Sequence, residues 1–368
     1  MEKVKFGIVG LGSAWSFHST GIKDNPKIKI NAGFDINKKN LKKFERRYKA
    51  ETFTDYEKFL NSDIDAVLIM VPHYLHKSMV IKAAEAKKHI LCEKPMARTL
   101  EECDDMIKAT KKNGVLFMIA ENHRFLPAHQ YIHDAIQDGL LGRVFLIRAY
   151  EGVNEISGLT TPNFWKGDPV KAGGGALMDM GSHKYAIINW ILNDKIKSAY
   201  CWVEKLSTNL PEKAEDNAIS LVKYERGTLV NITVSFSIIT PPTNSLELYG
   251  TEGSLIENHM WKNPVKINSY NDKMGEKKGK WYEPPIEHEP FPGYYKISSR
   301  IEDNYFTECI LKNKEPEFTP EQAKEAIAGV LLSYLSVKEK KLINYEDLIE
   351  IYRTQGTFSI ISNLEKFI

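Results

Sequence analysis

The chain has 368 residues, of which 27% are charged, and its formal net charge is +2. This length exceeds what one hydrophobic core usually organises, so we expect two domains. The near balance of charge gives no sign of a surface for nucleic acid or for an anionic membrane. The apolar run at residues 4–10 is too short for a signal peptide or a membrane span, and we expect a cytoplasmic protein that binds small molecules.

The first third of the chain alternates short apolar runs with helical patterns. Predicted strands cover residues 4–9, 29–34, 66–71, 89–92 and 115–120, and predicted helices cover residues 13–24, 38–48, 77–86 and 100–113. Continuous apolar strands are typical of parallel sheets that are buried on both faces. The repeated β-α-β order predicts a doubly wound parallel sheet over residues 1–123.

After residue 122 the rhythm changes to longer alternating runs, which indicate an antiparallel sheet with one solvated face. The runs cover residues 144–150, 197–204, 218–224, 228–237 and 245–249, with hairpin turns expected at 225–227 and 250–253. Helices are predicted at residues 127–137, 176–192 and 319–338. We expect residues 124–368 to form the second domain, with 260–294 as a long excursion or lid and the tail after 342 partly helical.

A glycine-rich turn joins the first predicted strand to the first predicted helix. Gly10 permits a tight turn, and Gly12 and Ser13 let backbone N–H groups approach a pyrophosphate at the helix N-terminus. Trp15 stands where the usual dinucleotide-binding pattern has its third glycine. The motif is weak by itself, and a plain turn is the alternative.

Asp35 follows the second predicted strand, at the position where a carboxylate accepts hydrogen bonds from the adenosine ribose. Such a carboxylate repels a 2′-phosphate, so we favour NAD over NADP, although Lys38 and Lys39 lie close by. The alternative is that Asp35 caps the helix that follows it.

Three further loops after predicted strands carry polar side chains. They hold His76, then Glu93 and Lys94, and then Asn122 and Arg124. The carboxyl ends of parallel strands hold the ligand in open α/β sheets, so these groups point to a cofactor and substrate site. Lys94 could instead lie at the surface. His76 could have a structural role as a cap of the following helix, or it could face the cofactor.

A second glycine-rich segment, residues 173–175, precedes Asp179 and His183. A spacing of four residues puts both side chains on one face of a helix. The pair could be catalytic, a surface contact or part of a metal site. No third histidine or cysteine stands at a suggestive spacing, and the four cysteines are scattered, so we expect no metal and reduced, structural thiols.

In this order the motifs resemble the Gfo/Idh/MocA family, named for glucose–fructose oxidoreductase and inositol 2-dehydrogenase. The likeness extends to about residue 337. It is carried by Gly10-Leu11-Gly12 with His18, Asp35, Pro72 with His76, Glu93-Lys94-Pro95, Asn122 with Arg124, Phe164-Trp165, Gly173-Gly174-Gly175 and Asp179-Met180-Gly181-Ser182-His183.

The resemblance implies a Rossmann domain followed by an α/β domain whose large, open, mainly antiparallel sheet mediates homodimers or homotetramers. It implies that Lys94, Asp179 and His183 form the catalytic group, and that Glu93 and Asn122 hold the cofactor near its nicotinamide end. Trp15 departs from the family pattern. So does Ala186, which stands where many members carry an acid three residues after the histidine.

These residues lead us to expect an NAD-dependent dehydrogenase that oxidises a secondary hydroxyl of a sugar, glycoside or cyclitol. His183 would act as general base, Lys94 would stabilise the developing alkoxide, and Asp179 would orient them. Trp165 could stack on a sugar ring, and Arg124 could receive a carboxylate or phosphate. The alternatives are a redox-neutral glycoside hydrolase or lyase with tightly held NAD, and a non-enzymatic NAD-binding sensor.

Overall fold

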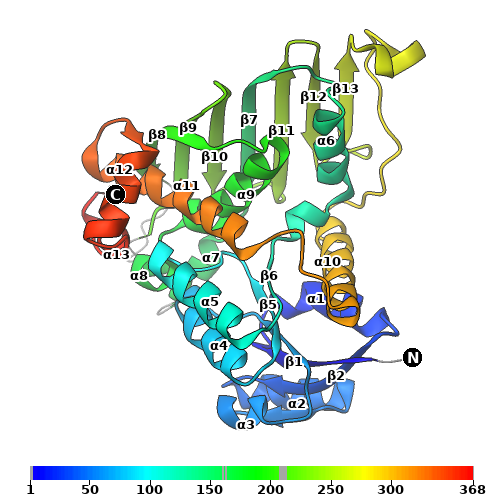
Figure 1. The fold of residues 1–368 in the computed structure, drawn as a ribbon, viewed down its shortest axis with the longest axis vertical. Coiled ribbons are helices and arrows are strands. Elements are labelled where there is room, and N and C mark those ends of the chain that lie inside the picture. Colours follow the sequence, from blue (N-terminus) through cyan, green and yellow to red (C-terminus); the bar gives the residue numbers. More distant parts are fainter. Residues whose placement is uncertain (1–2, 160, 162–163, 207–213, 368) are drawn as a thin grey trace. The chain divides into compact units, whose positions relative to one another are not determined.

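The computed structural model describes residues 3–159, 161, 164–206 and 214–367. The chain forms two compact units, each assembled from separate stretches of sequence (Figure 1). The first unit contains Met1–Ala97, Glu101–Phe125 and Tyr295–Lys324, and the second contains Arg98–Leu100, Leu126–Tyr294 and Glu325–Ile368.

The first unit is built on a six-stranded parallel sheet of order β3-β2-β1-β4-β5-β6. Its strands are β1 (Val4–Val9), β2 (Ile28–Phe34), β3 (Glu51–Phe53), β4 (Ala66–Ile69), β5 (His89–Glu93) and β6 (Phe117–Ala120). The predicted doubly wound parallel sheet is confirmed. The strand order reverses between β1 and β4, which is the point where such sheets bind ligands at their carboxyl edge.

Helices connect the parallel strands of the first unit. They are α1 (Trp15–Asp24), α2 (Lys38–Tyr48), α3 (Tyr56–Leu60), α4 (His73–Glu85), α5 (Leu100–Asn113) and the short 3-10 helix η1 (Asn122–Phe125). A later helix, α10 (Gly293–Lys312), also belongs mainly to this unit. Phe306 of α10 packs edge-on against Phe6 of β1 with ring centroids 6.5 Å apart, so α10 helps to close the core.

The second unit is built on an eight-stranded sheet of order β13-β12-β11-β7-β10-β9-β8-β14. Its strands are β7 (Val144–Gly152), β8 (Ile196–Glu204), β9 (Asn217–Tyr224), β10 (Leu229–Ser235), β11 (Thr243–Gly250), β12 (Gly253–Asn258), β13 (Val265–Ser269) and β14 (Ile343–Asn344). Neighbours pair antiparallel except β7 and β10, which are parallel. The mainly antiparallel sheet and both hairpin turns are confirmed.

Strand β13 lies inside residues 260–294, which we had expected to be an excursion or lid. That expectation is wrong for Val265–Ser269, which pair in register with β12. Val265 and Ile267 are fully buried on the sheet, but two alternations are too short a pattern to stand out among the surrounding lysines and glycines.

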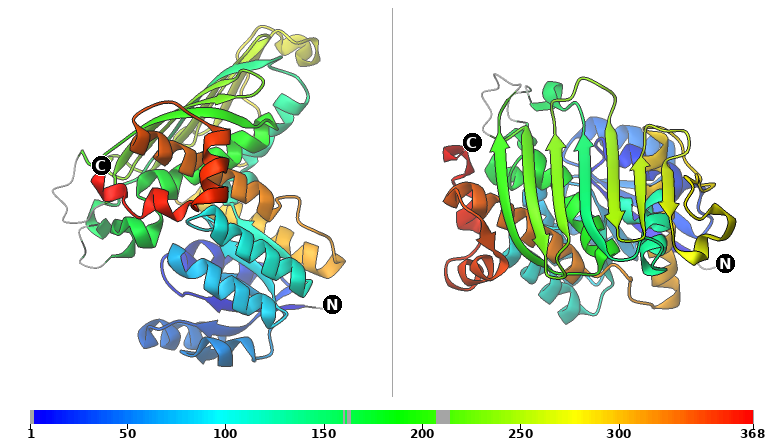
Figure 2. Two further views of the ribbon diagram at one scale, coloured as in Figure 1. Left: turned by 60° about the vertical axis from the view of Figure 1, so that its left-hand side comes forward. Right: turned by 90° about the horizontal axis from the view of Figure 1, so that it is seen from above.

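The second unit also contains helices, and Figure 2 shows α6 and α9 against one face of its sheet. The helices are α6 (Pro127–Gln137), α7 (Ile156–Leu159), α8 (Pro169–Ala172), α9 (Ser182–Leu192), α11 (Pro320–Glu339), α12 (Tyr345–Thr354) and α13 (Phe358–Ile361). The tail after residue 342 joins the second unit, because β14 pairs with β8 and Asn344 caps α12. Within the described residues, no helix has the length and apolarity needed to cross a bilayer.

Candidate active site

The first glycine-rich turn connects β1 to α1 in the first unit. Gly10 has a φ of +85°, and a Cβ there would collide with the carbonyl oxygen of Met70, so no other residue fits. Gly12 differs, because a Cβ built on it would meet nothing within 4 Å. Gly12 and Ser13 are both exposed at the start of α1. This open space beside a helix N-terminus fits a pyrophosphate.

Trp15 replaces the third glycine of the common pattern, and the structure shows how the helix still packs. The buried indole lies between α1 and α2, with its ring centroid 5.8 Å from that of Phe44 and 5.5 Å from that of Tyr48. An aromatic cluster between two helices therefore takes the place of close helix–strand contact.

Asp35 braces the glycine turn from the end of β2. Its Oδ2 accepts hydrogen bonds from the backbone N–H of Leu11 at 2.9 Å and from the amide of Asn40 at 3.1 Å. Its Oδ1 accepts one from the backbone N–H of Asn37 at 2.7 Å. Asn37, not Asp35, caps α2, so the helix-cap alternative is wrong. The carboxylate is thus fixed where the turn and the second strand meet.

Lys94 follows directly on β5, and the residue before it is held on both carboxylate oxygens. Glu93 accepts the backbone N–H of Lys94 on Oε2 at 3.1 Å, and its Oε1 lies 3.0 Å from Nε2 of His18. Nδ1 of His18 lies 2.8 Å from Oδ1 of Asp303 on α10. Burial alone would lower the pKa of His18, but the Asp303 and Glu93 carboxylates outweigh it and raise that pKa well above its ordinary value.

His76 is engaged by the main chain. Its Nδ1 lies 3.0 Å from the carbonyl oxygen of Pro95, and its Nε2 lies 2.9 Å from that of Val71. The ring is fully buried, and burial lowers its pKa, so the neutral form donates to one carbonyl at a time. His76 joins the exits of β4 and β5 and so positions the loop that carries Lys94.

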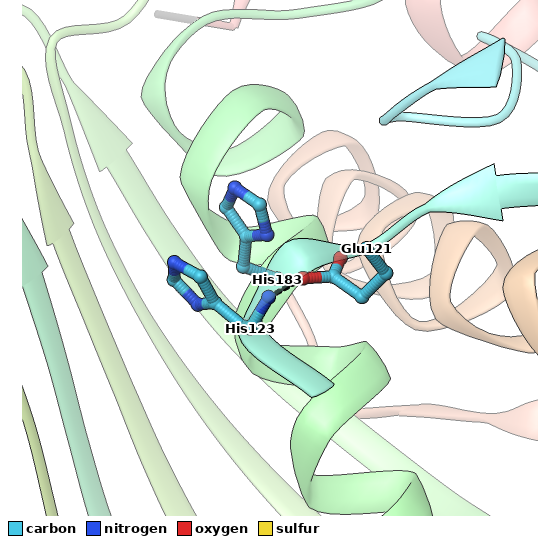
Figure 3. Close-up of side chains that lie close together, drawn as sticks. All are labelled: Glu121, His123 and His183. Atoms are coloured by element: carbon cyan, nitrogen blue, oxygen red, sulfur yellow. Dashed lines mark hydrogen bonds between the residues drawn. The ribbon is translucent and has the colours of Figure 1, made fainter. Parts of the chain in front are cut away.

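The loop after β6 carries the next group of predicted residues. The side-chain amide of Asn122 donates to the hydroxyl of Ser298 on α10 at 2.9 Å. The backbone N–H of His123 donates to the Glu121 carboxylate at 3.3 Å, as Figure 3 shows. Asn122 and Glu121 are both buried, so this loop is rigidly fixed at the carboxyl end of β6.

Arg124 packs within the first unit. Its guanidinium lies 4.5 Å from the centre of the Phe318 ring and donates to the side-chain oxygen of Gln322 at 3.2 Å. Burial lowers the pKa of Arg124 to about 10, so the side chain remains a cation at neutral pH.

In the second unit, Asp179 and His183 lie on consecutive helical segments. Asp179 belongs to a π-helical turn, Leu177–Gly181, and His183, labelled in Figure 3, belongs to the first turn of α9. Single π turns are frequent at functional sites because they re-aim side chains. Both residues are buried, and Ala186 one turn later is buried as well.

Lys166 is a contact of Asp179 that sequence reasoning missed. Its Nζ lies 3.0 Å from Oδ2 of Asp179 and 5.9 Å from the centre of the Trp165 ring. The half-buried Trp165 begins a short 3-10 turn that carries this lysine. No local pattern links positions 166 and 179, so only the folded chain reveals the pair.

The triple glycine serves packing inside the protein. Gly174 has a φ of +141°, and a Cβ there would overlap the hydroxyl of Tyr334. That hydroxyl donates to the Glu215 carboxylate at 2.6 Å, and the same oxygen accepts the N–H of Leu177 at 3.0 Å. Burial raises the pKa of Glu215 to about 7. A buried polar network therefore holds the segment that leads into Asp179.

Comparisons with known proteins identify relatives over most of the chain. The myo-inositol 2-dehydrogenase of Thermotoga maritima is 23% identical over 94% of this chain and 100% of its own length. A 2,7-anhydro-N-acetylneuraminate hydratase of Escherichia coli is 33% identical over 38% of each chain. The structure of levoglucosan dehydrogenase with NADH and levoglucosan matches with a TM-score of 0.84 and 20% identity over 94% of this chain and 100% of that one, which confirms the fold.

Two family models account for much of the sequence. Residues 4–121 match the model described as "Oxidoreductase family, NAD-binding Rossmann fold". Residues 129–256 match the GFO/IDH/MocA C-terminal domain. Together these matches span more than half of the chain, and they confirm the expectations of an oxidoreductase and of an NAD-binding domain. The protein belongs to the Gfo/Idh/MocA family of oxidoreductases.

Proposed function

We propose that the protein is an NAD-dependent dehydrogenase that oxidises a secondary hydroxyl group of a sugar, a glycoside or a cyclitol. Relatives named for inositol and levoglucosan oxidation support this substrate class. The observation that carries the proposal is Lys94, which directly follows a strand of the NAD-binding sheet at its carboxyl end. A lysine there suits an oxygen that gains negative charge during oxidation.

The residues of the glycine turn fit the cofactor. The space around Gly12 at the N-terminus of α1 suits the pyrophosphate, and the Asp35 carboxylate suits the adenosine ribose. We propose that Glu93 and Asn122, both fixed by hydrogen bonds at the ends of β5 and β6, hold the nicotinamide end. When bound, NAD supplies the nicotinamide carbon that accepts a hydride.

We propose that His183 accepts the hydroxyl proton while Lys94 hydrogen-bonds the same oxygen. An imidazole suits this role because the neutral ring accepts a proton on one of its nitrogens. Asp179 would orient the reacting hydroxyl or the histidine. Its ion pair with Nζ of Lys166, at 3.0 Å, would help to fix the position of the carboxylate. Trp165, next to Lys166, would offer its ring to the apolar face of a sugar, and Arg124 would receive an acidic substituent where the substrate has one.

The test is a screen of free sugars, inositols and glycosides with NAD and NADP, followed by Lys94→Ala and His183→Ala on the best substrate. We expect each variant to lose about 10²- to 10⁴-fold in kcat at saturating NAD. Lys108→Ala, a change at an exposed lysine on α5, is the control and should retain full turnover. Turnover that survives in both site variants would contradict the assignment, and a tenfold preference for NADP would contradict the role given to Asp35.

A redox-neutral reaction is the second candidate, and the likeness to a hydratase over 38% of the chain favours it. Such an enzyme would oxidise its substrate transiently, eliminate or hydrolyse, and then reduce the product with the same cofactor. Product formation without accumulation of reduced nicotinamide absorbance would identify this chemistry. Steady accumulation of that absorbance would identify the dehydrogenase.

Assembly into a homodimer or homotetramer, and location in the cytoplasm, stay predictions. We propose that the open face of the second sheet forms the subunit contact, because large apolar side chains are exposed along four of its strands. They are Phe145, Trp202, Ile219, Leu221 and Leu229. Light scattering on the wild type and on Trp202→Lys tests this, since a monomeric wild type would contradict it.

A further inference from the structure

Three ligand-type side chains converge inside the second unit, and no step of the proposed reaction uses them. They are His129 on α6, Glu257 on β12 and His259, which follows that strand. Their nitrogen and oxygen atoms lie within 4.8 Å of one another. Each residue is at most 1% exposed, so the cluster is sealed from solvent. Polar groups buried this deeply require partners.

The geometry of the cluster is poor for hydrogen bonding. Nε2 of His259 lies 2.6 Å from Oε1 of Glu257, and Nε2 of His129 lies 3.8 Å from its Oε2. Within the described part of the chain, neither carboxylate oxygen of Glu257 and neither ring nitrogen of His259 has a hydrogen-bond partner of acceptable geometry. A sealed carboxylate in this position is costly unless a cation completes it.

A buried lysine also lies near the cluster, and it is paired with another acidic residue. The nearby buried ammonium of Lys184 has its own carboxylate, with Nζ 3.5 Å from Oε2 of Glu151.

The surroundings hold His259 in place. Its backbone N–H donates to the carbonyl oxygen of Asn244 at 3.1 Å, and its own carbonyl oxygen accepts from Nε2 of His288 at 2.9 Å. The ring of Tyr294 lies against its imidazole with centroids 4.6 Å apart. Fixed backbone and ring orientation are what a preorganised metal ligand requires.

We propose that His129, Glu257 and His259 bind a divalent transition-metal cation, of which zinc is the best fit. Two imidazoles and one carboxylate are a donor set that zinc accepts, with a fourth position left for water. Because the ligands come from helix α6 and from the end of β12, the ion would tie that helix to the outer part of the sheet. This site is independent of the proposed dehydrogenase reaction.

The competing occupant is a proton shared among the same three side chains. A proton would neutralise Glu257 and need no metal. The two occupants differ in what a chelator does, because a chelator removes zinc and leaves a proton in place.

The experiment uses the full-length chain without a histidine tag. After dialysis against a chelator, the protein is titrated with Zn²⁺, and with Co²⁺ as a spectroscopic probe. We expect one ion per chain by elemental analysis, visible cobalt bands of a four-coordinate nitrogen–oxygen site, and a thermal midpoint that rises when zinc is restored. No bound metal, and a thermal midpoint that neither chelator nor zinc changes, would overturn the proposal.

Variants locate the ion. Glu257→Gln keeps the side-chain volume and should weaken zinc binding by at least about 10-fold, the loss expected even for an indirect partner of a metal ligand. His259→Gln should do the same, while His133→Gln, a histidine elsewhere on α6, should bind zinc like the wild type. Equal zinc affinity in all three variants would place the metal elsewhere and overturn the assignment. If the cluster variants do not fold, the cobalt spectrum of the wild type alone decides.

Discussion

Each unit of this protein contains a buried histidine–carboxylate cluster, and the two clusters differ in how their imidazoles are hydrogen-bonded. In the first unit, both ring nitrogens of His18 lie within 3.0 Å of carboxylate oxygens, one from Glu93 and one from Asp303. In the second unit, His259 and Glu257 are equally close but lack directed hydrogen bonds within the described residues. Similar residue types therefore serve different ends: His18 positions Glu93 in the first unit, and the second cluster is the proposed cation site.

The first cluster has one further carboxylate, that of Glu302, whose oxygens have no hydrogen-bond partner among the described atoms. Burial raises the pKa of Glu302 well above its ordinary value, which favours the neutral form of this side chain. Both nitrogens of His18 are already used, so this cluster offers no imidazole to a metal.

The two glycine-rich segments also differ between the units, in whether the space beside a glycine is open or filled. Space is open beside Gly12 in the first unit, whereas Tyr334 fills the space beside Gly174 in the second. Open space next to a helix N-terminus indicates a ligand, and filled space indicates packing. The closest neighbours of the second segment are atoms of its own unit.

Among the variants that test the difference between the two clusters, we expect the largest loss of unfolding free energy from His18→Ala. Removing the imidazole leaves Asp303 and Glu93 as buried or half-buried carboxylates without their cation. Breaking such a buried pair costs about 3–5 kcal/mol, which urea unfolding would measure. A loss below about 1 kcal/mol would mean that the cluster does not hold the first unit together.

The stability of His18→Gln, measured against that of the wild type at several pH values, tests the charge of His18. The folded pKa of His18 is raised above the ordinary value of 6.5, so its contribution to stability is complete below that pH. The contribution is lost as the pH rises through the folded pKa. The stability gap between wild type and His18→Gln should therefore shrink in alkaline solution, and a gap that grows there would contradict the charge assigned to His18.

Gly174→Ala should cause the next largest loss of unfolding free energy. The added methyl group overlaps the buried hydroxyl of Tyr334, and the φ of +141° is unfavourable for alanine. Overpacking and backbone strain together should cost about 3 kcal/mol in unfolding free energy. Gly174→Ala combined with Tyr334→Phe removes the overlapping oxygen and should recover part of the loss. No recovery would mean that backbone strain, together with overlap of the added methyl group with ring carbons of Tyr334 at 2.6 and 2.8 Å, explains the cost.

Sequence patterns predicted most elements of the first unit because its strands are buried on both faces. The runs at β1, β2, β4 and β5 match the structure to within about two residues. Helix α10 was missed for a physical reason: its buried positions include Ser298, Glu302 and Asp303, so its inner face does not read as apolar. The short elements β3 and α3 carry too few residues to show a period.

The residues of the candidate site also fall into two groups, those that the sequence identifies and those that only the folded chain reveals. Asp35 and Lys94 could be identified from the sequence because each follows a strand, and strand ends share one edge of the sheet. The contact between His18 and Asp303 spans 285 residues, and nothing local predicts it. Lys166 was missed because its partner Asp179 lies beyond a turn and three glycines whose path only folding determines.

Glu215→Gln tests the network around the second glycine segment. The pKa of Glu215 rises from 4.5 to about 7 on folding, so this residue contributes full stability below pH 4.5 and loses it as the pH rises to about 7. The glutamine stays neutral and keeps an oxygen for Tyr334 and Leu177. At pH 8 the unfolding free energy of the variant should exceed that of the wild type by at most about 3 kcal/mol. Near pH 4.5 the two unfolding free energies should be equal. A parallel pH dependence in both proteins would show that another group titrates.

Gly12→Ala should have the smallest effect on stability and the most specific effect on function. A Cβ at this exposed position meets no protein atom within 4 Å, so the unfolding free energy should change by less than about 0.5 kcal/mol. The same methyl group would occupy space assigned to the pyrophosphate, so NAD affinity should fall by about tenfold, or about 1.4 kcal/mol. Calorimetric titration with NAD measures this, with Lys108→Ala, a change at an exposed residue of α5, as the control. If Gly12→Ala binds NAD like the wild type, the open space beside α1 is not where the cofactor lies, and the contrast between the two glycine segments loses its functional meaning.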